Sequence, residues 1–367
     1  MIAIVCAAGL MAVWILYPAV IGVVAGVRPR SSAAAPAEWP DVSIVVATRE
    51  PESAIRDRVR NLLETAYPLA HIEIIIGHDR SSPAPSIEVP AGVRLRTVPG
   101  DEPGGKATSL NAALRAAGTD VVVFADTYQR YGPDTIPHLV EALLQPGVGA
   151  VTGAYRLAPG TGKLVSLYWS FERWLRRTEA RVHSSVGATG AVYAIRRALW
   201  NPLPAGLILD DVFTPMNIVL AGQRVAVADG ALALETRTPT PRQEYGRKVR
   251  TLTGVIQLCA WLPAVVVPIR NPIWVQFMFH KVLRLLTPWF MLGIAVWAAW
   301  SLGGRLDSLA LAVCAGLAVL TGLWLSVSGG RVGSRLRRII VEALLIQVAV
   351  LVAGFNGLRG HWRVWDA

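Results

Sequence analysis

Long apolar runs constrain this chain more than any other feature of its sequence. Residues 2–27 carry no charged side chain, and about 20 such residues cross a hydrocarbon core about 30 Å thick. Three further runs, at residues 288–302, 306–327 and 339–355, each approach that length. Hydrophobic residues make up 53% of the 367 residues, which exceeds the usual fraction in a soluble domain. The sequence therefore predicts a chain that lies partly in lipid.

A cleaved signal peptide is the alternative interpretation of the first run. The pattern disfavours it, because no basic residue precedes the apolar stretch and no small-x-small cleavage site stands before Arg28. We therefore expect this run to remain in the chain as a membrane-spanning helix.

An arginine cluster sets the expected orientation in the membrane. Arg331, Arg335, Arg337 and Arg338 fall in what we expect to be a short loop between the last two runs. Loops rich in Lys and Arg stay on the cytoplasmic side. Counting crossings back from this loop places residues 28–284 in the cytoplasm. We predict a multi-pass protein of the cell inner (plasma) membrane.

The predicted organisation has six parts. They are an N-terminal transmembrane helix (1–27), a linker (28–40), a cytoplasmic domain (41–251), interfacial amphipathic helices (252–287), three C-terminal transmembrane helices (288–356) and a basic tail (357–367).

Charge and cysteine content exclude several classes of function. The net charge is +11, but the arginines gather beside the apolar runs, where anionic lipid attracts them. We therefore expect membrane lipids as partners and no nucleic acid. Cys6, Cys259 and Cys314 lie in apolar segments without metal or disulfide spacing, so we interpret them as small packing residues.

Strands alternate with helices in the middle segment. Short apolar runs rich in β-branched residues predict strands at 41–47, 72–76, 93–98 and 120–125, and helical periodicity predicts helices at 53–65 and 107–117. This order is typical of an α/β fold with a mostly parallel sheet and ligands at the carboxyl ends of its strands. Asp79, Lys106 and Asp126 follow predicted strands, so three loops are expected to converge on one nucleotide.

An acidic pair and a basic cluster point to the chemistry. Asp210 and Asp211 begin a helical run, and Arg247, Lys248 and Arg250 follow just before the chain becomes apolar. Sugar transfer from a nucleotide donor requires a carboxylate that takes a proton and cations that hold a diphosphate. The combination favours a membrane glycosyltransferase.

The order of motifs resembles the family 2 glycosyltransferases, in the membrane branch that includes polysaccharide synthases and ceramide glucosyltransferase-like enzymes. The resemblance implies the Rossmann-like GT-A nucleotide-sugar fold and extends over nearly the whole chain. It rests on the stretches VSIVVATRE, HDRSS, GGKATSLNAAL, GATGAVYAIRRALW, LDDVFTPMNIVLAG and GRKVRTLTG.

The resemblance also implies residue roles. On the donor side it implies that the nucleotide sugar is held by Thr48, Glu50, Asp79, Lys106, Asn111 and Asp126, with a divalent metal, Mg²⁺ or Mn²⁺, on Asp126. It implies that Asp211 is the general base beside Asp210. It also implies that the diphosphate and the acceptor are bound by Arg247, Lys248, Arg250, Gly187, Thr189 and Gly190.

Two positions depart from the family pattern. Tyr128 stands where the family has a second acidic residue or asparagine, and a phenol is a poor ligand for Mg²⁺ at neutral pH. Metal binding is therefore expected to be weakened, with Gln129 or another acid as a substitute. Thr251 replaces the tryptophan that processive synthases place beside the acceptor sugar, which makes polymerisation less expected than single transfer.

The sequence thus predicts an inverting transferase that uses a UDP-sugar donor and a glycan or lipid acceptor for cell-envelope or extracellular polysaccharide. Export or assembly partners are expected because four spans hardly enclose a glycan channel. Two alternatives remain open. One is a glycolipid synthase that adds a single sugar, and the other is a catalytically weakened nucleotide-binding scaffold of an assembly complex.

Overall fold

The computed structural model describes residues 1–28, 36–158, 163–237, 240–303 and 331–362. The chain divides into two compact units. The helical unit comprises Met1–Val20, Thr240–Ile256 and Met278–Ala367, and the sheet unit comprises Ile21–Pro239 and Gln257–Phe277.

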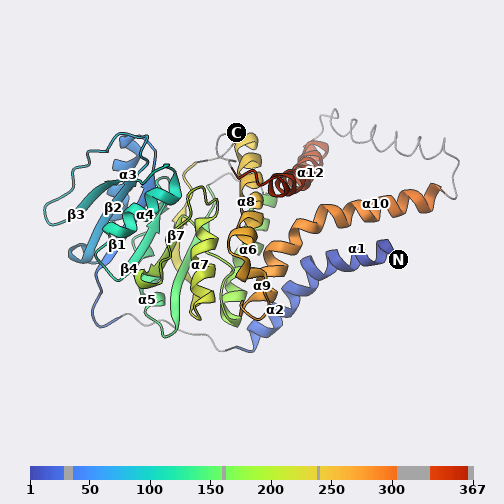
Figure 1. Cartoon of the computed structure of the whole chain (residues 1–367), viewed down its shortest axis with the longest axis horizontal. Helices are drawn as coiled ribbons and strands as arrows, with labels where there is room; N and C mark the ends of the chain where they lie inside the picture. Colours follow the sequence, from blue (N-terminus) through green and yellow to red (C-terminus); the bar gives the residue numbers. More distant parts are fainter. Residues whose placement is uncertain (29–35, 159–162, 238–239, 304–330, 363–367) are drawn as a thin grey trace. The chain divides into compact units, whose positions relative to one another are not determined.

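One eight-stranded mixed sheet forms the centre of the sheet unit (Figure 1), with strand order β3-β2-β1-β4-β7-β6-β8-β5. The neighbours β3, β2, β1 and β4 pair in parallel, as predicted. Strand β7 pairs antiparallel with both β4 and β6, so the second half of the sheet is mixed. The strands are β1 (Val42–Thr48), β2 (Ile72–His78), β3 (Arg94–Pro99), β4 (Val121–Ala125), β5 (Arg130–Tyr131), β6 (Val148–Arg156), β7 (Val192–Arg196) and β8 (Arg224–Leu234).

Helices cover both faces of this sheet. Alternate residues of a strand point to opposite faces, and Ile44, Ile74 and Val123 join one buried core with the apolar sides of α3 and α5. Helix α4 packs on the other face, where its Ser109 lies against Gly77. The helices of the unit are α3 (Glu52–Leu63), α4 (Lys106–Ala116), α5 (Thr135–Leu143), α6 (Lys163–Val182), α7 (Asp210–Leu220) and α9 (Trp274–Phe277), with short helical turns at Leu69–His71, Arg197–Leu199 and Pro263–Val266.

The contact between β2 and α4 leaves no room for a side chain at Gly77. A Cβ there would lie 2.6 Å from the backbone carbonyl oxygen of Ser109, so Gly77→Ala must push the helix from the sheet. Overpacking of this kind costs about 1–3 kcal/mol. We expect a lower thermal unfolding midpoint for detergent-solubilised Gly77→Ala. Gly118→Ala is the control, because the nearest atom to its Cβ would be 3.9 Å away, and an equal loss in both variants would contradict the packing argument.

Helices α1 and α10 run side by side in the helical unit (Figure 1). Gly9 of α1 (Ile2–Met11) lies against the ring of Phe290 on α10 (Thr287–Gly303). A little further along the chain, Trp14 Nε1 donates a hydrogen bond to Thr287 Oγ1 at 3.1 Å. The N-terminal helical stretch continues through a π-helical turn (Ala12–Leu16) into α2 (Tyr17–Gly26).

Among the described residues, two helical stretches, Ile2–Gly26 and Trp274–Ala298, are long and apolar enough to cross a membrane. Length and composition alone are weak evidence for a span. The second stretch starts ahead of the predicted run at 288–302 and passes through the turns Met278–Val282 and Leu283–Leu286. The predicted span at 306–327 lies outside the described residues.

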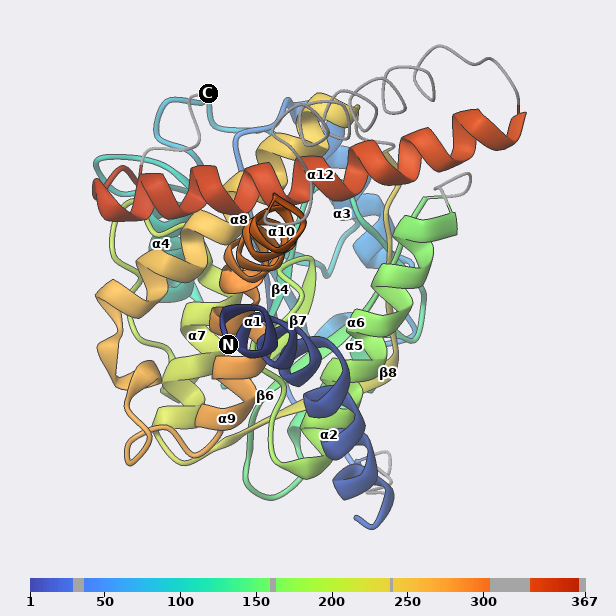
Figure 2. The ribbon, with the colours of Figure 1, turned by 90° about the vertical axis from the view of Figure 1, so that its right-hand side faces the viewer.

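Two segments that we expected to connect elements lie inside continuous helices. The four arginines expected in a loop lie in the first turns of α12 (Arg331–Leu358), since arginine is a good helix former and no proline interrupts the stretch. The predicted domain boundary at residue 251 falls inside α8 (Pro241–Trp261), because helical periodicity continues across it. Figure 2 shows that α12 crosses α10 rather than running alongside it.

Candidate functional site

Three strand ends meet at the carboxyl edge of the parallel half of the sheet. The loop after β1 contacts the loop after β4 twice, because Thr127 Oγ1 donates to Thr48 Oγ1 at 2.9 Å and the Tyr128 hydroxyl donates to Glu50 at 2.6 Å. Thr48 is buried, and its hydroxyl also accepts a hydrogen bond from the backbone N–H of Glu50. The parallel strand order therefore brings these predicted residues together.

Asp79 ties the loop after β2 to the start of α4. One carboxylate oxygen accepts from the backbone N–H of Gly105 at 2.6 Å, and the other accepts from Ser81. Partial burial would raise the pKa of Asp79, but these hydrogen bonds and nearby Arg49 outweigh it and hold the pKa below its usual value. Gly104 and Gly105 have φ values of +95° and +98°, which only glycine adopts readily. They bring backbone close to any ligand ahead of the helix.

Lys106, the first residue of α4, connects two of the predicted acidic residues. Its ammonium lies 3.2 Å from Asp126 Oδ1 and 3.4 Å from Asp210 Oδ2. Burial acts to lower the pKa of Lys106, but the carboxylates of Asp126, Asp210 and Asp211 outweigh burial and raise it, so the ammonium stays charged. Burial raises the pKa of Asp210 to about 6 against the opposing effect of Lys106.

Asp211 faces a different surface from Asp210. Successive residues of a helix point about a quarter-turn apart, and a Cβ at Gly190 would lie 3.2 Å from Asp211 Oδ2. The Asp211 backbone carbonyl also accepts a hydrogen bond from Ala188 N at 2.7 Å, and Gly187 has φ of +107°. The glycine loop 187–190 therefore packs against the second acid, while the first acid pairs with Lys106. Half-buried Asp211 is the more accessible of the two.

Not every predicted site residue joins this cluster. The side-chain amide of Asn111 donates to the carbonyl of Leu203 and accepts from its N–H, both at 2.8 Å, which anchors a loop. Arg247 and Lys248 belong to the helical unit, where both pair with Glu244. Arg250 lies one turn further along the same helix. The diphosphate role of this basic cluster stays a prediction.

Sequence reasoning missed a buried arginine beneath the site. Arg58 on α3 is 1% exposed, and its guanidinium donates to Asn61 Oδ1 at 2.7 Å and to the carbonyl of Gln129. It also stacks on the ring of Tyr131 at 4.1 Å. It thus fixes the loop that carries Asp126. Its position on the apolar stripe of α3, between Ile55 and Leu62, was the available signal.

Tyr193 was also missed. It is fully buried in β7 and stacks on Phe124 of β4 with ring centroids 4.2 Å apart. Burial, together with the charges of Asp210, Asp211 and Asp126, raises its pKa well above the usual value. Its hydroxyl has no hydrogen-bond partner among the described residues. A tyrosine in an otherwise apolar strand was the only sequence signal.

Few side chains of the site are available as ligands for a metal ion. Asp126 supplies one carboxylate, while the Tyr128 hydroxyl is committed to Glu50, whose hydrogen bond raises the pKa of the phenol and keeps it neutral. The amide nitrogen of Gln129 donates to Glu235 at 2.8 Å. The described ranges contain no group of three or more His, Cys, Asp or Glu residues that could hold a metal. One carboxylate still fits Mg²⁺, which commonly takes its other ligands from substrate phosphates and water.

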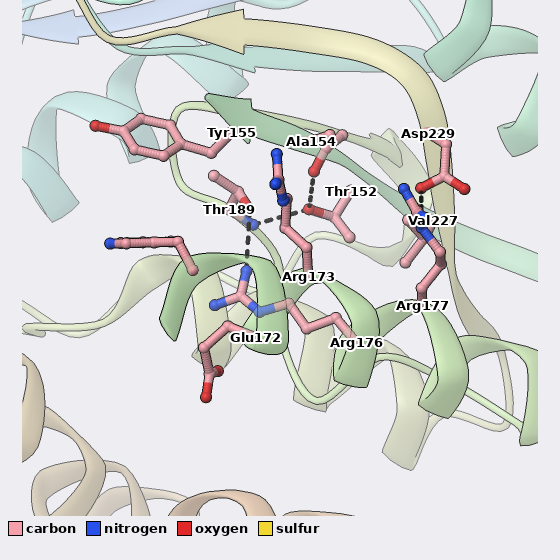
Figure 3. Close-up of a pocket in the computed structure, with 12 residues that line it drawn as sticks. Thr152, Ala154, Tyr155, Glu172, Arg173, Arg176, Arg177, Thr189, Val227 and Asp229 are labelled. Carbon is pink, nitrogen blue, oxygen red and sulfur yellow. Dashed lines mark hydrogen bonds and ion pairs between the residues drawn. The ribbon is translucent and has the colours of Figure 1, made fainter. Parts of the chain in front are cut away.

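A recess opens beside Thr189 of the glycine loop (Figure 3). Helix α6 forms one wall, strands β6 and β8 form the other, and Thr189 of the glycine loop lies between them. The lining residues are Thr152, Gly153, Ala154, Tyr155, Trp169, Glu172, Arg173, Arg176, Arg177, Thr189, Val227 and Asp229. None of the three arginines was predicted to belong to the site.

Comparisons with known proteins agree with this geometry. The family described as Glycosyltransferase like family 2 matches residues 40–254, which is more than half of the chain. No curated protein matches the chain by sequence.

Many solved structures match this chain. A mannosyltransferase from Pyrobaculum calidifontis, in complex with GDP-Man and Mn²⁺, has 23% identity and a TM-score of 0.73, with 100% of this chain and 98% of that chain covered. Glucosyl-3-phosphoglycerate synthase from Mycobacterium tuberculosis, in complex with Mn²⁺, UDP-glucose and phosphoglyceric acid, has 19% identity and a TM-score of 0.39, with 65% and 82% covered.

Proposed function

Since this chain belongs to the glycosyltransferase like family 2 and is a nucleotide-sugar transferase, we propose that it moves a sugar from a UDP-sugar, with inversion, to a glycan or lipid acceptor at a membrane. The observation that carries the proposal is the division of the acidic pair. Asp210 pairs with Lys106 on the donor side, and Asp211 packs against the glycine loop on the other side. A single displacement requires one group that acts on the donor and another that acts on the acceptor in the same step.

Asp211 is the proposed general base. In an inverting displacement the acceptor hydroxyl attacks the anomeric carbon from the face opposite the leaving diphosphate. Its proton passes to a carboxylate, which must be ionised and within reach of the acceptor. Asp211 meets the requirement better than Asp210, which is buried and already holds an ammonium ion.

Lys106 and the start of α4 are proposed to hold the departing diphosphate. The ammonium stays protonated because three carboxylates surround it. The glycine pair leaves the N-terminal backbone of α4 uncovered, and helix N-termini attract anions. Thr48, Glu50 and Asp79 are proposed to receive the uridine. The backbone N–H of Asp79 donates to the carbonyl of Thr48 at 2.8 Å, which supports this by connecting the loops after β1 and β2.

Asp126 is the residue proposed to hold Mg²⁺ or Mn²⁺ together with the donor phosphates. When bound, the ion would neutralise charge on the diphosphate as the glycosidic bond breaks. Lys106, 3.2 Å from the same carboxylate, supplies permanent positive charge there. We therefore propose a weaker dependence on metal than two acidic ligands would impose.

We propose that the chain is a multi-pass protein of the cell inner membrane with its sheet unit in the cytoplasm. The two apolar stretches support this, as does the arginine-rich segment from residue 331, because basic flanks stay on the cytoplasmic side. We expect the protein to stay in the membrane pellet after alkaline carbonate washing. Release into the supernatant would contradict the proposed location.

The test of function is nucleotide release by the detergent-purified full chain. A panel of UDP- and GDP-sugars is supplied with Mg²⁺, Mn²⁺ or EDTA. We expect release from one UDP-sugar, reduced but detectable with EDTA, and an inverted anomeric centre in the product by NMR. Product size separates single transfer from polymerisation. Tight UDP binding without release from any donor would instead favour the non-catalytic scaffold.

The rate is expected to fall on the acid side with an apparent pKa near 6. Asp210 has its pKa raised to about 6 by burial, so it becomes protonated as the pH falls through that value and no longer pairs with Lys106. An aspartate of ordinary pKa, about 3.9, would leave the rate flat from about pH 7 to 5. The measurement is kcat/KM against pH at saturating metal, and a flat profile down to about pH 5 would contradict the assignment.

A further inference from the structure

The recess beside Asp211 carries more positive charge than its own carboxylates balance. Among its three arginines, Arg177 is paired, since its Nε lies 2.6 Å from Asp229 Oδ1. Arg173 donates to Ser170 Oγ at 3.2 Å, and Arg176 donates to Thr189 Oγ1 at 3.0 Å. Neither of these two forms an ion pair with any residue that the structure describes. The Nε of Arg176 is buried there without a hydrogen-bond partner.

With Glu172 counted, the recess still has three arginines for two carboxylates. Glu172 points away from Thr189 in Figure 3, whereas the guanidinium of Arg176 points toward it and Arg173 extends toward the strands. Two guanidinium groups present planar sets of N–H donors, which match the oxygens of a phosphate in both geometry and charge. The recess is therefore suited to an anion.

Thr189 connects the recess to the proposed base. Its backbone N–H donates to Thr152 Oγ1 at 2.9 Å, and its hydroxyl accepts from Arg176. The next residue, Gly190, lies against the Asp211 carboxylate, and consecutive Cα atoms are only about 3.8 Å apart. An anion bound by Arg176 would thus contact the loop one residue before the glycine that lies against the base.

From this arrangement we infer that the acceptor carries a phosphate group, which Arg173 and Arg176 bind so that a nearby hydroxyl faces Asp211. The inference rests on the proposed function and names the acceptor class for the same site. Trp169 and Tyr155, whose ring centroids are 5.3 Å apart, line the recess beside the arginines and offer a surface for the uncharged part of the acceptor.

The surroundings of α6 favour a lipid as the source of that phosphate. Leu167 is 65% exposed and Trp174 is 42% exposed, and Trp174 packs against Gly22 in α2. Helix α6 therefore runs beside the end of the proposed N-terminal span and presents apolar side chains there. A phosphate-bearing lipid could place its head group at the arginines and its tail along this surface.

The first experiment uses inorganic phosphate as the probe. Binding is measured by calorimetry to the full chain in detergent, with the nucleotide site saturated by UDP. We expect the double variant Arg173→Gln, Arg176→Gln to bind phosphate at least about tenfold more weakly than wild type, because hydrogen bonds to charged groups are lost. Arg177→Gln is the matched control on the same helix and should stay within about threefold, since Asp229 already balances its charge. Equal binding by wild type and the double variant would overturn the inference.

The second experiment identifies the source of the phosphate. Transfer is compared between vesicles containing lysophosphatidate and vesicles containing monoacylglycerol, which both keep a free hydroxyl, and between glycerol 3-phosphate and glycerol in solution. We expect the phosphate-bearing member of one pair to have at least about a tenfold lower KM, with the advantage lost in the double variant and kcat little changed. The pair that shows it distinguishes a lipid from a soluble acceptor. Preference for the neutral members would overturn the inference.

The proposed function has a separate readout. Slow nucleotide release from a UDP-sugar without added acceptor reports on the donor site alone. If nucleotide release is retained but inorganic phosphate does not bind, only the phosphate-bearing acceptor is rejected. Absence of release from every donor rejects the proposed function itself.

Discussion

Asp211→Asn is expected to reduce sugar transfer by about 10²–10⁴-fold, the contribution of a general base in proton transfer. Asparagine keeps the size and shape of the side chain, so packing against Gly190 is preserved. It cannot accept the proton of the acceptor hydroxyl. The loss is expected in kcat, while the dissociation constant for UDP stays within about twofold, because Lys106 forms its ion pairs with Asp126 and Asp210 rather than with Asp211.

The measurement compares steady-state transfer and UDP binding by calorimetry for wild type and Asp211→Asn. Asp120→Asn serves as the control, because Asp120 is exposed at the opposite end of β4 and should leave both quantities unchanged. Transfer by Asp211→Asn at more than a tenth of the wild-type rate would reject Asp211 as the base. The proton would then have to pass to another group.

The parallel half of the sheet was predictable because it is built from local signals. Strands β1, β2 and β4 are short, buried β-branched runs followed by polar loops, and the predicted strand at 72–76 lies within β2. The antiparallel half gave weaker signals. Strand β8 alternates between buried and exposed positions and contains Gly230, and its partner β5 has only two residues. Pairing between such distant segments depends on tertiary contacts rather than on local pattern.

The site residues also divide into those that local sequence signals predict and those that depend on tertiary contacts. Asp79, Lys106 and Asp126 each follow a strand, so topology alone predicted that they converge. Asn111 lies one helical turn beyond that edge, and its amide is used by Leu203, which a motif cannot reveal. Arg176 is separated from Thr189 by 13 residues and meets it only after α6 folds over β6. The positive charge of the recess could therefore not be predicted from the sequence.

Lys106→Met is expected to cause the second largest loss. Methionine keeps the volume but removes the charge between Asp126 and Asp210, so the buried carboxylate of Asp210 loses the ammonium at 3.4 Å. Lost hydrogen bonds to charged groups cost about 1.5–3 kcal/mol. Breaking a fully buried ion pair costs up to about 5 kcal/mol. We expect a smaller cost here, because 29% of the Lys106 side chain and 36% of the Asp126 side chain are exposed. We expect about a ten- to hundredfold lower kcat/KM and a higher apparent pKa for the acid limb, since the cation that lowers the pKa of Asp210 is gone.

A double variant separates the structural effect of Lys106 from its effect on the donor. Lys106→Met combined with Asp210→Asn removes both charges of the pair, so the unfavourable burial of an unpaired carboxylate is relieved and thermal stability should recover. Activity should not recover, because no ammonium remains to hold the diphosphate. Because the two residues are in contact, their effects on stability are expected to be non-additive. Recovery of transfer along with stability would mean that Lys106 only neutralises Asp210 and has no contact with the donor.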